Sequence, residues 1–523
     1  MYILTTPEGA DLPASASVEG FPLLVRLDKD FFDFSQAKPK GEDIRFSTAA
    51  GQALSHQIEQ WDADKGRAII WVRIPRITGN SKQKIRLHWG HASAESASNG
   101  KAVFDASNGH LAVWHMNGPV TEDEVGVIKS QDAGTSAAPG TIGPARHFPG
   151  GKGVYCGENI RTFPTGSKSH SSSVWFRATK PNCRVLSWGK EYKQGKVQMW
   201  YNSPAQIRMD CYFSDADVRS SPVIPLDQWT HVVHTYRKGE SRIYINGVLD
   251  TEARTRATTL NIERPARMWI GGWYGNYDFI GDIDELRISD VTRSPAWIKL
   301  AYENQKALHR LLGPLVKPGD TLSVSPNAVT VSEGRSARVR ARIAGAQKFY
   351  WVLKRRGKET VVAVDRGSYT LDAGRVSGDE SVLLQLRALY PDGVRTRDVS
   401  IQVTEAIPDP VVSLRAPLTW DGRKTIEIIP TVTNAQAIQE AGAGDLTYDW
   451  TVSGMAVIQD AAPDKLILSR AQNSGQLTVT LTVSNGGAPI ASTAIVSVQE
   501  PAQDAWVYRR PGKDEKPQDK QFY

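Results

Sequence analysis

Apolar and polar residues alternate in short runs along most of the chain. Examples are residues 68–74 (AIIWVRI), 242–245 (RIYI) and 477–483 (LTVTLTV), each bounded by Gly, Pro, Asn or Asp. A period of two residues places apolar side chains on one face of a strand, and turn residues separate successive strands. The pattern predicts an all-β protein built from sandwiches or barrels.

Helical spacing of apolar residues occurs clearly at one place, residues 294–302 (SPAWIKLAY). Ser294 is a favourable N-cap, and Pro295 suits the first turn because it lacks an N–H that the helix would leave unbonded anyway. We expect a short helix here that closes a domain.

Proline-containing joints at 313–318, 407–410 and 500–501 divide the chain. The two segments between these joints have nearly equal length, suit immunoglobulin-like sandwiches, and carry Trp351 and Trp450 respectively. The predicted segments are 1–107, 108–312, 313–406, 407–500 and a polar tail or linker at 501–523.

Composition narrows the class of protein further. The 523 residues carry a formal charge of +7, from 63 basic and 56 acidic residues that are interspersed, so a nucleic-acid partner is not indicated. There is no apolar run of transmembrane length, and the opening residues lack a signal peptide, so we expect a fragment of something longer with no membrane span. The three cysteines, Cys156, Cys183 and Cys211, are too few for a disulfide framework and leave at least one unpaired, while a Cys183–Cys211 bridge stays open.

Five blocks near the start of the chain occur in an order that is familiar from a known family. The blocks are 21–27 (FPLLVRL), 41–46 (GEDIRF), 56–62 (HQIEQWD), 70–75 (IWVRIP) and 85–90 (IRLHWG). Through them residues 21–105 resemble the domain of unknown function 2341, found in secreted bacterial proteins and in some fusions to energy-transducing proton channels.

A second set of blocks lies in the middle of the chain: 228–236 (QWTHVVHTY), 242–247 (RIYING), 268–272 (MWIGG) and 279–288 (FIGDIDELRI). Through them residues 110–305 resemble the laminin-G-like jelly roll of the concanavalin-A-like lectin and glucanase superfamily. The Asn246-Gly247 pair independently predicts a hairpin turn. The expected fold is therefore all-β, with multidomain β-sandwiches around a central concanavalin-A-like jelly roll.

The order of these domains, followed by two immunoglobulin- or PKD-like sandwiches, resembles large exported planctomycete-type proteins. That resemblance implies a bacterial protein that is secreted or on the cell surface. Folds of this kind carry many functions, so the site must supply the argument for any one of them.

Catalysis by paired carboxylates is the activity that glucanases of this fold perform, and it requires several acids on one strand face. Regular alternation along 281–288 places Asp282 and Asp284 on one face, followed by Leu286, with Glu285 on the other. The acid set is then incomplete. We expect a protein that is not an enzyme.

The resemblance to laminin-G-like jelly rolls also implies one bound calcium ion. The matching positions are Asp123 and Asp284, which carbonyls and water would supplement. The alternative is that Asp284 is bonded within the sandwich and Asp123 is solvated.

Ligand recognition is expected to involve aromatic side chains, since a sugar ring presents a face of C–H groups to an aromatic plane. The loop at 272–278 and the strand around residue 200 supply the candidates, which are Trp273, Tyr274, Asn276, Tyr277, Trp200 and Tyr201. The competing interpretation is that some of these aromatics fill the core.

These observations favour a non-catalytic, secreted or cell-surface module for binding or adhesion, with glycan or another surface polymer as partner. Two alternatives stay open. One is a purely structural spacer or assembly part of a larger surface protein, and the other is the accessory region of a longer extracellular hydrolase.

Overall fold

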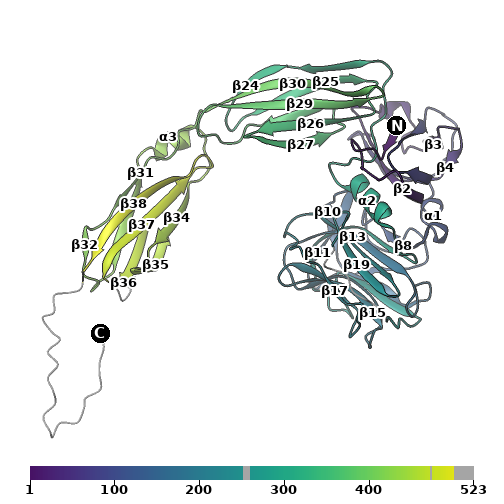
Figure 1. The fold of residues 1–523 in the computed structure, drawn as a ribbon, viewed down its shortest axis with the longest axis horizontal. Helices are drawn as coiled ribbons and strands as arrows, with labels where there is room; N and C mark the ends of the chain where they lie inside the picture. Colours follow the sequence, from purple (N-terminus) through teal and green to yellow (C-terminus); the bar gives the residue numbers. More distant parts are fainter. Residues whose placement is uncertain (251–258, 471–473, 500–523) are drawn as a thin grey trace, which may run out of the picture.

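The computed structural model describes residues 1–250, 259–470 and 474–499. Strands account for 52% and helices for 6% of the structure, which confirms the all-β class. The described chain forms an arc of four β units (Figure 1). No helix of the described residues is long and apolar enough to cross a membrane.

The N-terminal unit packs two small sheets against each other. Its apolar core includes Phe21, Phe46 and Ile70, all nearly inaccessible. The sheet orders are β1-β7-β3-β4 and β2-β6-β5. The bounds are β1 Tyr2–Leu4, β2 Ser17–Asp28, β3 Arg45–Thr48, β4 Ala53–Leu54, β5 His56–Asp62, β6 Arg67–Thr78 and β7 Lys82–His88, followed by α1 Gly100–Val103.

Within the described residues, the central sandwich pairs two larger sheets. We name the first the covered sheet; its order is β10-β11-β22-β13-β18-β19-β20, with β8 also paired to β22. Its strands are β8 His110–Trp114, β10 Ser136–Pro139, β11 Pro144–Pro149, β13 His170–Ala178, β18 Thr230–Arg237, β19 Glu240–Ile245, β20 Val248–Leu249 and β22 Ile280–Ser289.

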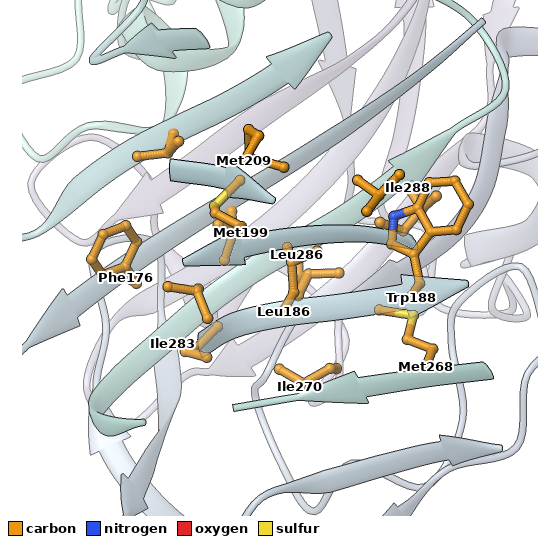
Figure 2. Close-up of a cluster of buried hydrophobic side chains, with 14 of the residues drawn as sticks. Phe176, Leu186, Trp188, Met199, Met209, Met268, Ile270, Ile283, Leu286 and Ile288 are labelled. Carbon is orange, nitrogen blue, oxygen red and sulfur yellow. The ribbon is translucent and has the colours of Figure 1, made fainter. Parts of the chain in front are cut away.

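We name the second the open sheet; its order is β17-β16-β15-β14-β21-β12-β9. Its strands are β9 Gln131–Asp132, β12 Val154–Ile160, β14 Cys183–Gly189, β15 Lys196–Asn202, β16 Gln206–Asp210, β17 Val218–Arg219 and β21 Ala266–Ile270. Leu186 and Met199 from this sheet meet Ile283 and Leu286 from the covered sheet, as Figure 2 shows, so the alternating strands bury one face each.

The three cysteines belong to this sandwich, and all are buried and unpaired. The Cys183–Cys211 bridge left open by the sequence does not form. Cys183 begins β14, Cys211 follows β16, and β15 runs between these strands. Two strand spacings are about 10 Å, which exceeds the reach of a disulfide.

The predicted helix is confirmed as α2, Pro295–Gln305, and the Trp297 N–H donates to its N-cap Ser294 Oγ at 3.2 Å. The expected segment 108–312 assigns this helix to the central unit alone, whereas in the structure it packs on two units. Trp297 and Leu300 join the core of the N-terminal unit, while Ile298 packs on Val233 and Tyr244 of the covered sheet. Helix α2 is therefore shared between the two units.

The third unit contains sheets β23-β25-β28 and β24-β30-β29-β26-β27, and the fourth contains β31-β33-β36-β35 and β32-β38-β37-β34. The bounds in the third unit are β23 Thr321–Ser325, β24 Ala328–Ser332, β25 Ser336–Ala344, β26 Lys348–Arg355, β27 Lys358–Val364, β28 Ser368–Asp372, β29 Glu380–Tyr390 and β30 Gly393–Thr404. In the fourth they are β31 Val412–Arg415, β32 Thr419–Trp420, β33 Ile426–Val432, α3 Ala435–Glu440, β34 Thr447–Val452, β35 Ala456–Ala462, β36 Lys465–Arg470, β37 Gly475–Ser484 and β38 Ile490–Val498.

The third unit docks on the N-terminal unit. The Tyr350 hydroxyl donates to the Glu8 carbonyl at 2.7 Å, and the Gly367 N–H donates to Asp30 Oδ2 at 2.8 Å. Phe31 also packs against Phe349, with 5.3 Å between ring centroids. The first three units are thus joined by direct contacts as well as by the chain.

Candidate functional site

The outer face of the covered sheet is buried against the N-terminal unit. Leu24 and Trp71 of that unit share one apolar cluster with Val113 and Trp175 of the covered sheet. The Trp175 indole N–H donates to Gln305 Oε1 of helix α2 at 2.7 Å. This face is consequently an internal interface of the molecule.

A β-bulge in strand β22 changes which of its acids share this face. Glu285 and Leu286 together lie opposite Val174 of β13, and Glu285 has a φ of 48°. An extra residue in one strand shifts the alternation, so Leu286 turns into the core while Glu285 joins Asp284 on the outer face. The expectation that Glu285 points away from Asp284 was wrong, because it assumed unbroken alternation.

A buried polar cluster connects this bulge to the N-terminal unit. His115 Nδ1 lies 2.6 Å from Glu285 Oε2 and 3.8 Å from Glu59 Oε2, and each of these side chains is about 1–2% exposed. The Trp71 indole N–H donates to Glu59 at 2.6 Å, and Arg287 Nε donates to Glu285 at 2.6 Å. The two carboxylates are therefore bound by donors on several sides.

The charges of this cluster depend on one another. Burial acts to lower the pKa of His115, but the charges of Glu285 and Glu59 outweigh it and raise that pKa to about 9. Burial raises the pKa of Glu59 to about 7. For Glu285 burial acts upward, and the positive charges of His115 and Arg287 overcome it, so its pKa is lowered. A protonated His115 between carboxylates is the arrangement that these shifts favour.

The same three side chains could hold a metal ion, because one potential ligand atom from each of Glu59, His115 and Glu285 lies within 4.8 Å of the others. The donors already present compete with a metal. Arg287 stays bonded to Glu285, and its guanidinium lies 4.6 Å from the centre of the Trp71 ring. Sequence reasoning missed this cluster, since its members come from distant parts of the chain.

The residues expected to bind calcium have other partners, and neither belongs to that cluster. Asp123 accepts backbone N–H groups from Val125, Gly126, Val127 and Ile128, and so closes its own loop. Asp284 accepts the N–H groups of Thr141 and Ile142, both at 2.9 Å, and burial raises its pKa well above the usual value. Calcium binding stays a prediction, and an ion at either residue would have to displace these donors.

The outer face of the open sheet lies away from the N-terminal unit, with β15 at the far end of the sandwich in Figure 1. The strand register places Trp200 between Arg184 and Arg208 on neighbouring strands. Both guanidinium groups lie within 6 Å of the centre of the Trp200 ring, at 5.7 and 5.9 Å. The half-buried Trp200 thus lies between two planar guanidinium groups.

A second row on this face runs through Tyr155, Trp269, Ser187, Gln198 and Asp210. Gln198 Nε2 donates to Ser187 Oγ at 3.0 Å. The ring centroids of Tyr155 and Trp269 are 5.4 Å apart. Ser187, Gln198 and Trp269 are at most 4% exposed, so this row lies under covering groups rather than open to solvent.

A tight hairpin turn lies over this row. The backbones of Trp273 and Asn276 exchange two hydrogen bonds of 3.0 Å, and the two residues between them, Tyr274 and Gly275, have φ values of 50° and 79°. Positive φ at both positions is typical of a type I′ turn and suits glycine or asparagine better than tyrosine. Tyr274 nevertheless stacks on Trp269 at 5.0 Å and remains 44% exposed.

The predicted aromatic residues separate into exposed and buried groups. Tyr274 and Asn276 are exposed, and Trp200 and Tyr277 are half-buried. Trp273 is only 6% exposed and donates its indole N–H to Glu191, while Tyr201 is fully buried and donates its hydroxyl to the Ile224 carbonyl at 2.7 Å. The structure corrects the prediction for these last two, which support the hairpin and the core rather than a binding surface.

Two family comparisons assign domains to parts of the chain. Residues 40–111 match the domain of unknown function 2341. Residues 150–299 match the concanavalin A-like lectin/glucanases superfamily, over the strands just described. The central sandwich is a concanavalin A-like domain. The sheets of the two C-terminal units are present but are not identified as immunoglobulin- or PKD-like. No curated protein matches the chain significantly.

Several solved structures resemble parts of the chain distantly. Domain 4 of AbnA, an extracellular arabinanase from Geobacillus stearothermophilus, in complex with arabinotriose, is 20% identical, covers 36% of this chain and 97% of its own, and has a TM-score of 0.31. The binding domain of Paraclostridial Mosquitocidal Protein 1 is 10% identical over 74% of this chain and 89% of its own, with a TM-score of 0.31. The SAP-like pentraxin of Limulus polyphemus is 15% identical over 26% and 71%, with a TM-score of 0.23.

Proposed function

We propose that this protein is a non-catalytic binding protein, secreted or on the cell surface, whose concanavalin A-like domain recognises glycan through the open sheet. The observation that carries the proposal is the exposed Tyr274, held over Trp269 at a backbone position that disfavours tyrosine. An unfavourable conformation at an exposed position suggests selection for a function rather than for stability.

The chemistry of the face fits a carbohydrate. A sugar ring offers C–H groups to an aromatic plane and hydroxyls to planar donors, and Trp200 stands between two arginines that could donate to such hydroxyls. The arginines are themselves balanced, since Arg184 pairs with Asp278 and Arg208 with Asp217. Balanced charge supports a neutral glycan over a strongly acidic polymer.

The absence of catalysis is part of the proposal, and the covered sheet supports it. The three acids of β22, Asp282, Asp284 and Glu285, are 5% exposed or less. Carboxylates enclosed in this way do not meet a polymer in solution. Release of reducing ends from any polysaccharide that binds the protein would contradict this part.

The proposal is tested by a glycan array on the whole chain, followed by calorimetric titration of the best ligand. We expect Trp200→Ala and Tyr274→Asn each to weaken binding by more than about tenfold, equivalent to about 1.4 kcal/mol. The matched control is Tyr448→Ala, which removes a half-buried tyrosine from the fourth unit. Equal binding by all variants would place the site elsewhere, and binding of no glycan would favour an architectural role.

A further inference from the structure

A small polar cavity lies between the covered sheet and helix α2, apart from the proposed glycan face. Its volume is about 20 Å³, and its walls include His110, Arg287 and Arg293 together with hydroxyl groups of the sheet and Trp297 of the helix. A volume of this size holds one water-sized occupant. The polar groups around it identify which occupant fits.

The cavity walls present several buried polar atoms without partners among the described residues. Arg287 Nη2, Arg293 Nη2 and both ring nitrogens of His110 have no hydrogen-bond partner. All three side chains belong to residues that are 9% exposed or less. An unpartnered buried donor costs about 1–3 kcal/mol, more when it is charged, so donors gathered around one space indicate a bound acceptor.

The charge around the cavity is positive. Arg287 is bonded to Glu285, a carboxylate that His115 also engages. Arg293 donates its Nε to Ser289 Oγ at 3.2 Å and lies 4.0 Å over the Trp297 ring, and it has no ion pair with a described carboxylate. Burial and the charge of Arg287 lower the pKa of Arg293 to about 9, and the charge of Asp290, which acts to raise it, does not offset them.

We propose that this cavity binds a single monatomic anion, chloride under physiological conditions. A halide accepts from both Nη2 groups and supplies a negative charge beside Arg293. Water supplies no charge, and a phosphate or sulfate is too large for the cavity. The cavity is lined by both helix α2 and the covered sheet, so the anion also strengthens the contact between them.

Crystals of the whole chain grown or soaked in sodium bromide give the direct test. We expect an anomalous peak within hydrogen-bonding distance of Arg287 Nη2 and Arg293 Nη2. Density for a water without anomalous signal at high bromide would overturn the proposal. This measurement uses the unmodified protein and does not depend on any variant folding.

Thermal melting at constant ionic strength gives a second test, with sodium chloride replaced by sodium methanesulfonate. Because the ion binds only the folded state, a tenfold excess of chloride over its Kd raises the melting temperature by about 3 to 6 °C. Arg293→Met should lose this response, and Arg237→Met, at an arginine 61% exposed, should keep it. Equal melting in both salts would contradict chloride binding.

Discussion

The two sheets of the concanavalin A-like domain share one core but differ in their outer faces. The covered sheet holds Glu285, Arg287 and His115 against the N-terminal unit, where these charges are nearly inaccessible. The open sheet presents Trp200 and Tyr274 to solvent in part. The same strand architecture thus serves as an internal interface on one side and as a candidate recognition surface on the other.

The difference shows how to interpret charged residues in this fold. The acids of β22 lie in a strand that, in the sequence, looks like a candidate for catalysis or metal binding. Their direct partners are a histidine, arginines and backbone N–H groups of the same domain. Of these partners, His115 also contacts the N-terminal unit, through Glu59 at 3.8 Å. The residues with open faces are the aromatics of the opposite sheet.

The largest effect is expected on the covered side, from Glu285→Ala. Removing this carboxylate leaves His115 and Arg287 buried without their shared partner, so the free energy of unfolding should fall by about 3 to 5 kcal/mol. Urea denaturation followed by tryptophan fluorescence measures it. In the control Glu19→Ala, which breaks an exposed pair with Arg76, the loss should stay below about 1 kcal/mol. Equal losses of unfolding free energy in the two variants would mean that the buried cluster contributes no more to stability than an exposed ion pair.

The covered side should also make stability depend on pH. His115 has a raised pKa of about 9 in the folded state, so its contribution is complete below pH 6.5 and is lost as the pH rises toward 9. Glu59, with its pKa raised to about 7, adds a loss between pH 4.5 and 7. Urea denaturation between pH 6.5 and 9 should show stability falling in the wild type and a flatter profile in His115→Gln. Identical profiles would show that His115 is not charged when folded.

Tyr201→Phe distinguishes the core from the binding face on the open side. The change removes the hydroxyl that bonds the Ile224 carbonyl and keeps the ring, so the free energy of unfolding should drop by about 1 kcal/mol. Glycan affinity, measured by calorimetry, should not change. A weaker glycan affinity with an unchanged free energy of unfolding would show that Tyr201 belongs to the binding site.

Tyr274→Asn should have the smallest effect on stability. Asparagine relieves the positive φ of the turn while the stacking on Trp269 is lost, and these contributions of about 1 kcal/mol nearly cancel. Denaturation should therefore differ from wild type by less than about 0.5 kcal/mol, although glycan binding falls. A large loss of stability would show that Tyr274 is structural.

Strand alternation and the recognised blocks were sufficient for the fold class and for helix α2. They could not predict which side chains of a strand face the core and which face outward. Alternation shows that Trp200 and Tyr201 face opposite sides, but which one is buried depends on the partner sheet. The bulge at Glu285 has no local signature as strong as a glycine, and the assumed register failed there.

Contacts distant in sequence were beyond such reasoning altogether. Glu59 and Glu285 meet across His115 because two units pack together, and no periodicity links residues more than 200 positions apart. The row around Trp200 depends on which strands are neighbours in the open sheet. Arg184 and Arg208 became candidates only through that register.

Helix α2 and the segment after it have a mechanical consequence. The Leu4 N–H donates to the Leu311 carbonyl at 2.7 Å, and the Gly313 N–H donates to the Tyr2 carbonyl at 2.9 Å. The N-terminal unit and the concanavalin A-like domain together thus form a loop of chain whose two ends are hydrogen-bonded to each other. A tension applied between residue 1 and the third unit would pass across this short backbone clasp. The concanavalin A-like domain would stay unstretched, with its open sheet undistorted, until the clasp ruptured.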